Sequence, residues 1–164
     1  FVVERETDGR EPSVRCINFG LDGMQSFSFT LEEERSAVLV PAGQVGTYLY
    51  EPNASVLKAG AFKQIAVRTG VKMLQVNSHL YTSDHLVSDF PGRRFRVDEV
   101  LSFTGKLCKG LSKTIPQANI TVRNFPLSVE ELRKRTKITD GGHVYLFATT
   151  LVDGEKVLVK CSKA

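Results

Sequence analysis

The chain has 164 residues and a net charge of +4, with 41% hydrophobic and 24% charged residues, so we expect a soluble chain with a buried core. No apolar run approaches the roughly 20 residues of a membrane helix, which excludes a transmembrane helix in this sequence. Three widely spaced cysteines, Cys16, Cys108 and Cys161, argue against a disulfide framework and a zinc site and favour the cytoplasm.

The first third of the chain predicts strands and turns. The chain begins without Met and its first residues read as a strand, so we expect an expressed fragment of a longer protein. Apolar residues over 14–19 and 26–29 predict two strands of a hairpin, with turn residues at 20–23. Thr30 and Glu33 have the spacing of a capping box and predict a short helix.

The next segment predicts a strand over 46–50, a helix over 54–69 and a strand over 80–82. Asn53 would cap the helix and Gly70 would end it. Gly60 inside the helix would mark close packing against a neighbour. Leu57, Ala61 and Ile65 form the expected buried stripe, and the expected solvent side holds Lys58, Lys63, Gln64 and Arg68.

Phe90-Pro91-Gly92 interrupts the pattern and predicts a boundary between two domains, 1–90 and 91–164. After it we expect a strand over 94–97, a helix over 105–114 and a strand over 118–123. A second helix follows Ser128, and a hairpin over 144–161 turns at Asp153-Gly154. This order predicts an α+β fold with helices packed on a sheet.

The second of these helices has the most specific start. Ser128 and Glu131 form a capping box, and Leu127 and Leu132 are placed to form a hydrophobic staple. These residues predict a helix that begins directly after Ser128.

The sequence argues against catalysis by this chain alone. Ser83, Asp84 and His85 are adjacent, but a catalytic triad is assembled in space and adjacency is no evidence for one. His79 and His143 flank predicted strands and are expected to be edge residues. Thr104-Gly105-Lys106 resembles the end of a phosphate-binding loop, but Val100 occupies the position of the required first glycine. There is no G-x-G-x-x-G either, so we expect no cofactor in this fragment.

The charged residues are unevenly distributed. Residues 1–50 carry 4 Lys and Arg against 8 Asp and Glu, and residues 51–164 carry 18 against 10. This division favours a basic part that meets an anion, although a chance distribution of solvated charge remains the alternative. The candidate RNA-binding residues lie on or next to two predicted strands and two predicted helices: Arg93, Arg94, Arg96, Lys106, Lys109, Lys113, Arg123, Arg133, Lys134, Arg135 and Lys137.

The spacing of three lysines and the presence of two aromatic residues both bear on the hypothesis of RNA binding. Lys106, Lys109 and Lys113 follow i, i+3, i+7 spacing and would lie on one helical stripe, with all the basic clusters sharing one surface. Tyr145 and Phe147 could stack on bases, but the core of a hairpin explains them better. An ordinary solvated helix face is the alternative for the clusters themselves.

Several segments have a distinctive combination of residues: GTYLYEPNASVLKAGAFKQIA (46–66) with its Ala59-Gly60 pair, SHLYTSD (78–84), FPGRRFRV (90–97), ANITVRNFPLSVEELRKR (118–135) and GGHVYLFATTLVDGEKVLVKC (141–161). Together they resemble the C-terminal region of bacterial class I S-adenosylmethionine-dependent methyltransferases. The resemblance implies a ferredoxin-like domain followed by a THUMP-like domain. Residues 1–45 match less clearly, and would add strands to the ferredoxin-like domain or follow a methyltransferase core.

The resemblance implies a function for the fragment. Such domains dock an RNA, commonly tRNA, on a methyltransferase whose separate catalytic domain binds S-adenosylmethionine. We therefore expect tRNA or rRNA and the protein's own catalytic domain as partners. One alternative is a scaffold that packs on the catalytic domain or a protein partner without touching RNA. Another is an enzyme that binds S-adenosylmethionine within this fragment.

Overall fold

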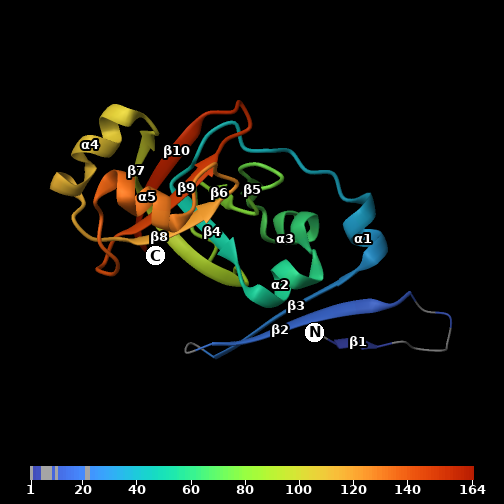
Figure 1. The fold of residues 1–164 in the computed structure, drawn as a ribbon. Coiled ribbons are helices and arrows are strands. Elements are labelled where there is room, and N and C mark those ends of the chain that lie inside the picture. Colours follow the sequence, from blue (N-terminus) through green and yellow to red (C-terminus); the bar gives the residue numbers. More distant parts are fainter. Residues whose placement is uncertain (1, 5–8, 10, 21–22) are drawn as a thin grey trace.

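Two β-sheets form the framework of the protein (Figure 1). The computed structural model describes residues 2–4, 9, 11–20 and 23–164. The smaller sheet has the order β1-β2-β3, and its strands are β1 (Val2–Glu4), β2 (Ser13–Gly20) and β3 (Gly23–Thr30). The larger sheet has seven strands in the order β5-β6-β4-β7-β10-β9-β8.

The strands of the larger sheet come from both halves of the chain. They are β4 (Tyr48–Pro52), β5 (Lys72–Met73), β6 (Tyr81–Ser83), β7 (Gly92–Ser102), β8 (Asn119–Arg123), β9 (Tyr145–Thr150) and β10 (Lys156–Lys163). Neighbouring strands are antiparallel except β8 and β9, which are parallel. The pairing of β4 with β7 carries the sheet across residues 90 and 91, so the division into domains 1–90 and 91–164 stays a prediction.

Four helices cover one face of the larger sheet, and a fifth follows the hairpin. Helices α2 (Ala54–Ala59) and α3 (Phe62–Thr69) pack on Tyr50, Met73 and Tyr81. Helices α4 (Gly105–Thr114) and α5 (Val129–Thr136) pack on the other end of that face, on a cluster that includes Leu146, Ala148 and Leu158. Helix α1 (Leu31–Ser36) follows β3. The predicted α+β fold with helices packed on a sheet is therefore confirmed.

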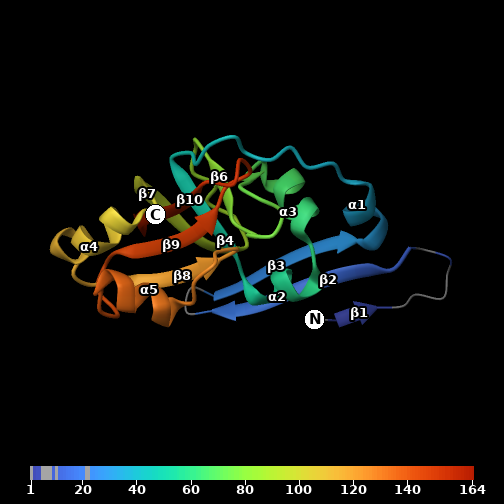
Figure 2. The same cartoon turned by 45° about the horizontal axis from the view of Figure 1, so that its top comes forward.

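The predicted hairpin is confirmed as β2 and β3, which pair along their whole length. Its turn residues Leu21 and Asp22 lie outside the described residues. One face of the hairpin buries Val14, Cys16 and Phe29 against α2 and α3. The hairpin therefore adds a layer below these two helices (Figure 2).

The prediction of one helix over 54–69 is wrong. Asn53 caps α2 as expected, but Gly60 adopts a left-handed conformation with φ of 73° and ends the helix. A Cβ atom at Gly60 would meet no atom within 4 Å, so the expectation of close packing there is also wrong. The residue is needed for its positive φ. The break turns Val56 inward, while Leu57 is only half-buried.

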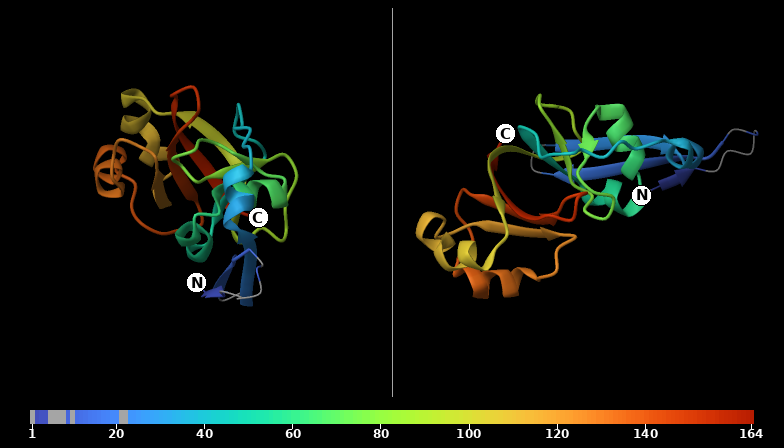
Figure 3. Two further views of the ribbon diagram at one scale, coloured as in Figure 1. Left: turned by 90° about the vertical axis from the view of Figure 1, so that its right-hand side faces the viewer. Right: turned by 90° about the horizontal axis from the view of Figure 1, so that it is seen from above.

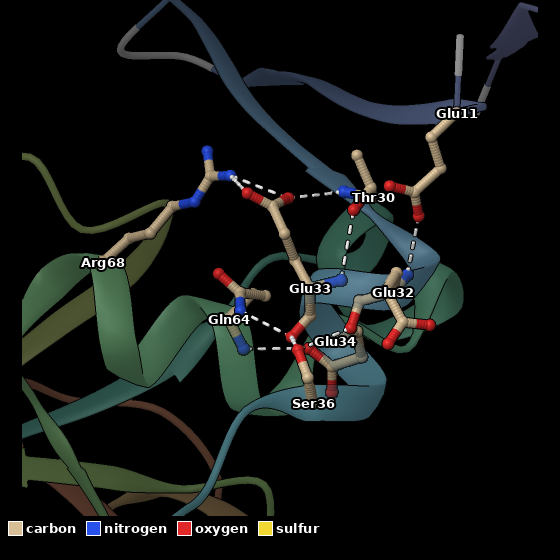
Figure 4. Close-up of polar contacts among 8 residues, drawn as sticks. All are labelled: Glu11, Thr30, Glu32, Glu33, Glu34, Ser36, Gln64 and Arg68. Carbon is tan, nitrogen blue, oxygen red and sulfur yellow. Dashed lines mark hydrogen bonds and ion pairs between the residues drawn. The ribbon is translucent and has the colours of Figure 1, made fainter. Parts of the chain in front are cut away.

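The expectation that Gln64 faces solvent is wrong as well, because the start of α3 lies against α1 (Figure 4). Ala61 occupies the N-cap position of α3 and has no side chain that can cap it. The carboxylate of Glu34 supplies the cap instead, accepting hydrogen bonds from the backbone N–H groups of Lys63 at 2.9 Å and Gln64 at 2.8 Å. The side chain of Gln64 donates to the backbone oxygen of Glu33 at 2.7 Å.

The second half of the chain has the predicted order of elements. Both predicted capping boxes are present, at Thr30 for α1 and at Ser128 for α5. Strand β7 is longer than the expected 94–97, and the two-residue strand β5 was not expected at all. The strand predicted over 80–82 is β6 (Tyr81–Ser83), which begins and ends one residue later.

The larger sheet is strongly curled. Strands β4 and β8 lie four steps apart, which would separate them by roughly 19 Å in a flat sheet. Arg123 at the end of β8 nevertheless contacts Glu51 of β4, with 2.9 Å between Nη2 and Oε1. A β-bulge at Asp98, where the register between β7 and β10 shifts, adds to the twist that allows this contact. Gly92 is required at the start of β7, because a Cβ atom there would lie 2.1 Å from the backbone oxygen of Glu51.

The hairpin with α1, α2 and α3 forms one end of the molecule, and α4 and α5 form the other (Figures 1 and 3). Helices from the basic part of the sequence, residues 51–164, therefore lie at both ends. In the part of the chain that the structure describes, the helices are too short and too polar to cross a membrane.

Candidate nucleic-acid interface

Helix α4 presents a stripe of lysines directly away from the core. Thr104 caps the helix, accepting a hydrogen bond from the backbone N–H of Leu107 at 3.1 Å. Leu111 and the following Ile115 are buried against the sheet. At 100° per residue the stripe lies on the opposite side of the helix, and its three residues are exposed as predicted: Lys106, Lys109 and Lys113.

Helix α5 adds a second group of exposed cations. Lys134, Arg135 and Lys137 are exposed, and Lys137 ends the helix with a φ of 63°. Positive charge in the last turn stabilises a helix through its dipole, which is a structural explanation for this group. The dipole of α5 does not explain why a second group of cations lies on the neighbouring helix α4.

The two groups of cations belong to one surface, because α4 and α5 pack on the same core cluster. Burial raises the pKa of the Cys108 thiol on α4, and the nearby guanidinium of Arg135 acts in the opposite direction, so Arg135 lies close to α4. None of the six forms an ion pair with another described residue. We call this set the α4–α5 basic surface: Lys106, Lys109, Lys113, Lys134, Arg135 and Lys137.

Arg133 is a candidate residue that the structure uses internally. Its guanidinium donates to the backbone oxygens of Ala118 at 3.2 Å and Ile138 at 3.3 Å, and it pairs with Asp140 at 2.5 Å. Only 21% of its side chain is exposed. These bonds join the end of α5 to the start of β8.

Arg93 and Arg123 lie on the face of the sheet opposite α4 and α5, so the eleven candidates do not share one surface. Both bind the carboxylate of Glu51, whose side chain is only 7% exposed. Oε2 accepts from Nε and Nη2 of Arg93, and Oε1 accepts from Nε and Nη2 of Arg123. A buried carboxylate needs such partners. The three residues hold two distant strands of the curled sheet together.

Arg94 and Arg96 lie on one face of β7, as predicted from the alternation, but in different surroundings. The guanidinium of Arg94 donates to the backbone oxygen of Ser88. Arg96 is exposed, beside Tyr48 of β4 and Ser162 of β10. RNA contact by any of the eleven residues stays a prediction.

The serine and histidine side chains considered for catalysis make contacts within the fold. Ser83 donates to the backbone oxygen of His85 at 2.6 Å and contacts the hydroxyl of Tyr50 at 2.8 Å, so its hydroxyl does not face an imidazole. His79 stacks on Phe62 with ring centroids 3.9 Å apart. Burial, together with the nearby Arg123, lowers the pKa of His79. No group of three or more His, Cys, Asp or Glu side chains suited to a metal occurs in the described ranges.

Two features of the site were not predicted from the sequence. One is Glu51, whose position directly opposite Arg93 depends on the register of β4 and β7. The only signal was a carboxylate inside the apolar strand Tyr48–Pro52. The other is Lys163, which lies with Tyr145 in a cavity at the end of the sheet.

Two family models match this chain. Residues 48–91 match the model of a ferredoxin-like domain, and residues 92–163 match the model of a THUMP-like domain. The chain contains a ferredoxin-like domain followed by a THUMP-like domain. The α4–α5 basic surface belongs to the THUMP-like domain, and so does every other candidate residue.

The fold is also found in a larger protein. A crystal structure of a proposed methyltransferase from Porphyromonas gingivalis matches with 47% sequence identity and a TM-score of 0.88. The match covers 93% of this chain and 38% of that one, so the present chain spans well under half of its relative's length. Comparison with curated protein sequences finds no match.

Proposed function

We propose that this chain is the RNA-docking part of an S-adenosylmethionine-dependent methyltransferase, and that the α4–α5 basic surface binds the RNA backbone. The RNA is a tRNA or an rRNA, bound in the cytoplasm. The observation that carries the proposal is the set of six exposed lysines and arginines without ion-pair partners among the described residues, on two adjacent helices of a THUMP-like domain. Flexible and forked cations spaced along a surface are what phosphate contacts require.

The proposal places S-adenosylmethionine on residues outside this chain. The cavity that offers aromatic side chains, Phe95 and Tyr145, is also lined by Arg93, Arg94 and Lys163. The sulfonium and amino groups of the cofactor outnumber its single carboxylate, so three cations would repel it on balance and these residues do not fit it. Catalysis is therefore assigned to the protein's own catalytic domain.

The test is a charge reversal of the lysine stripe. K106E/K109E/K113E should lose most binding to tRNA, measured by filter binding over 50–300 mM salt, while its circular dichroism spectrum stays that of the native protein. If each lysine contacts one phosphate, the slope of log K against log salt should become shallower by about 2–3.

The matched control reverses three exposed lysines elsewhere, K58E/K72E/K156E, and so changes the net charge equally. Binding that falls equally in both variants would show that only net charge matters. Binding that is unaffected in the stripe variant, or that does not depend on salt, would refute the proposal.

A second function, packing on the catalytic domain without RNA contact, is favoured by a different observation. Phe19 and Met24 are cross-strand partners near the end of the hairpin and are 80% and 57% exposed. An exposed apolar pair of this kind is typical of an interaction site. If the scaffold function holds, F19S/M24S in the full-length protein should abolish methylation of every substrate while K106E/K109E/K113E has no effect.

A further inference from the structure

A cavity of about 260 Å³ lies at the end of the larger sheet where β7 begins, β10 ends and β9 begins. Phe95 and Tyr145 supply aromatic rings, and three cations complete most of the wall. The lining consists of Gly92, Arg93, Arg94, Phe95 and Tyr145, with Lys163 and Ala164 at the end of the chain. This cavity lies apart from the α4–α5 basic surface.

Three aromatic residues form a cluster that extends from the core to the cavity, and their exposure increases in that direction. Phe147 is fully buried, as expected of a core residue in a hairpin. Phe95 is 1% exposed, and its ring centroid lies 4.9 Å from those of Phe147 and Tyr145. Tyr145 is half-buried, so it is the most exposed of the three rings, while Phe95 lines the cavity beside it. A ring supported from behind in this way offers a fixed platform for a flat ligand.

The cations around this platform are partly fixed by the protein. Nε and Nη2 of Arg93 bind Glu51, and its Cζ atom lies 5.4 Å from the centroid of the Phe95 ring, while 53% of the side chain stays exposed. Arg94 is tethered to the backbone of Ser88. Lys163 is exposed and forms no ion pair with any residue that the structure describes. The ligand must therefore bring negative charge.

We infer that this cavity binds one unpaired nucleotide of the RNA, with the base against Tyr145 and the phosphate between Arg93 and Lys163. A planar base and an adjacent phosphate match an aromatic platform flanked by cations, which is how proteins hold single-stranded nucleic acid. The inference rests on the proposed function, because it identifies which part of an RNA reaches this end of the sheet.

The position of the cavity allows one RNA to reach both sites. Helices α4 and α5 both end at the side of the sheet where β8 and β9 begin, and β9 begins at Tyr145. Lys113 and Lys137 stand at these helix ends. The C-terminus lies towards the α4–α5 end of the molecule in Figures 1 and 2, and Figure 3 shows it on the other side of the sheet from these helices. A backbone that follows the α4–α5 basic surface would therefore have to pass around this end of the sheet to reach the cavity.

The experiment titrates the protein with three probes: nucleoside 5′-monophosphates, the corresponding nucleosides, and inorganic phosphate. Binding is followed by NMR shift changes of the amides of residues 92–95, 145 and 163. The monophosphates should bind more tightly than either of the other two probes. Y145F keeps the ring and should bind as the wild type does, whereas Y145L should bind roughly 5- to 100-fold more weakly, the range expected for one stacked base.

A second variant, K163E, lies at the exposed end of β10 and should also weaken monophosphate binding, while K156E at the start of the same strand should not. Unchanged affinity in Y145L and K163E, or phosphate binding as tightly as the monophosphates, would overturn the inference. The two proposals fail separately: K106E/K109E/K113E should keep the monophosphate site, and Y145L should keep the salt-dependent part of tRNA binding.

Discussion

Replacing Glu51 by Gln tests the most unusual interaction in the fold. The carboxylate is 7% exposed and accepts four hydrogen bonds from Arg93 and Arg123. Removing one member of a fully buried ion pair costs about 3–5 kcal/mol, because the remaining charge is left unpaired. Here the two arginine side chains are 53% and 34% exposed, so solvent screens part of that cost. We expect E51Q to lower the free energy of unfolding by about 2 kcal/mol.

The assay is urea denaturation followed by circular dichroism, with thermal melting as a second measurement. A loss of this size corresponds to a decrease in Tm of about 4–8 °C for a chain of this length. The control is E99Q, the same chemical change at an exposed carboxylate on β7, which should stay within about 0.5 kcal/mol of the wild type. If E51Q unfolds at the wild-type urea concentration, the bonds to Arg93 and Arg123 do not hold the curled sheet together, and the reasoning is refuted.

Three further predictions follow from single residues. G92A should destabilise the protein by at least about 1–3 kcal/mol because its Cβ would overlap β4, whereas G110A, which meets no atom within 4 Å in α4, should stabilise it by about 1 kcal/mol; equal urea midpoints would contradict both. E34A should cost about 1 kcal/mol in urea denaturation through loss of the α3 cap, and E32A in the same helix should not. Burial, aided by Asp98, raises the pKa of the Cys161 thiol from 9.0 to about 12. The folded state therefore keeps this proton longer than the unfolded state does, so stability should fall between about pH 9 and 12, and it should fall less in C161A than in the wild type because Cys16 and Cys108 still contribute there.

Features that depend on neighbouring residues were predictable from the sequence. The capping boxes at Thr30 and Ser128, the cap at Asn53 and the stripe on α4 need only a few residues in a row, and the structure contains all of them. The Asp153-Gly154 hairpin belongs to the same class. Local hydrogen bonds and periodicity determine these features, so a single sequence contains the information.

Features that depend on distant partners were not predictable in this way. Gly60 is compatible with a tolerated residue inside one helix or with the end of a helix, and the choice follows from packing of α3 against α1. Gln64 looked like a solvent residue because its partners, Glu33 and Glu34, come from about 30 residues earlier in the chain. Tyr145 and Phe147 lie on the same face of β9, and Tyr145 is less buried because it stands at the end of the strand, which depends on how the distant strands meet there.

The basic residues also differ in whether their charges are already paired within the fold. Lysines of the α4–α5 basic surface keep their charges in solvent, so they can gain from phosphate binding without breaking a bond within the fold. Arg123 and Arg133 would have to give up Glu51 or Asp140 first. Arg93 combines both situations, because Glu51 binds Nε and Nη2 while 53% of the side chain stays exposed and the residue lines the cavity. A cation held in place before the ligand arrives loses little conformational entropy on binding. E51Q should therefore weaken monophosphate binding as well as stability, whereas E99Q should change neither.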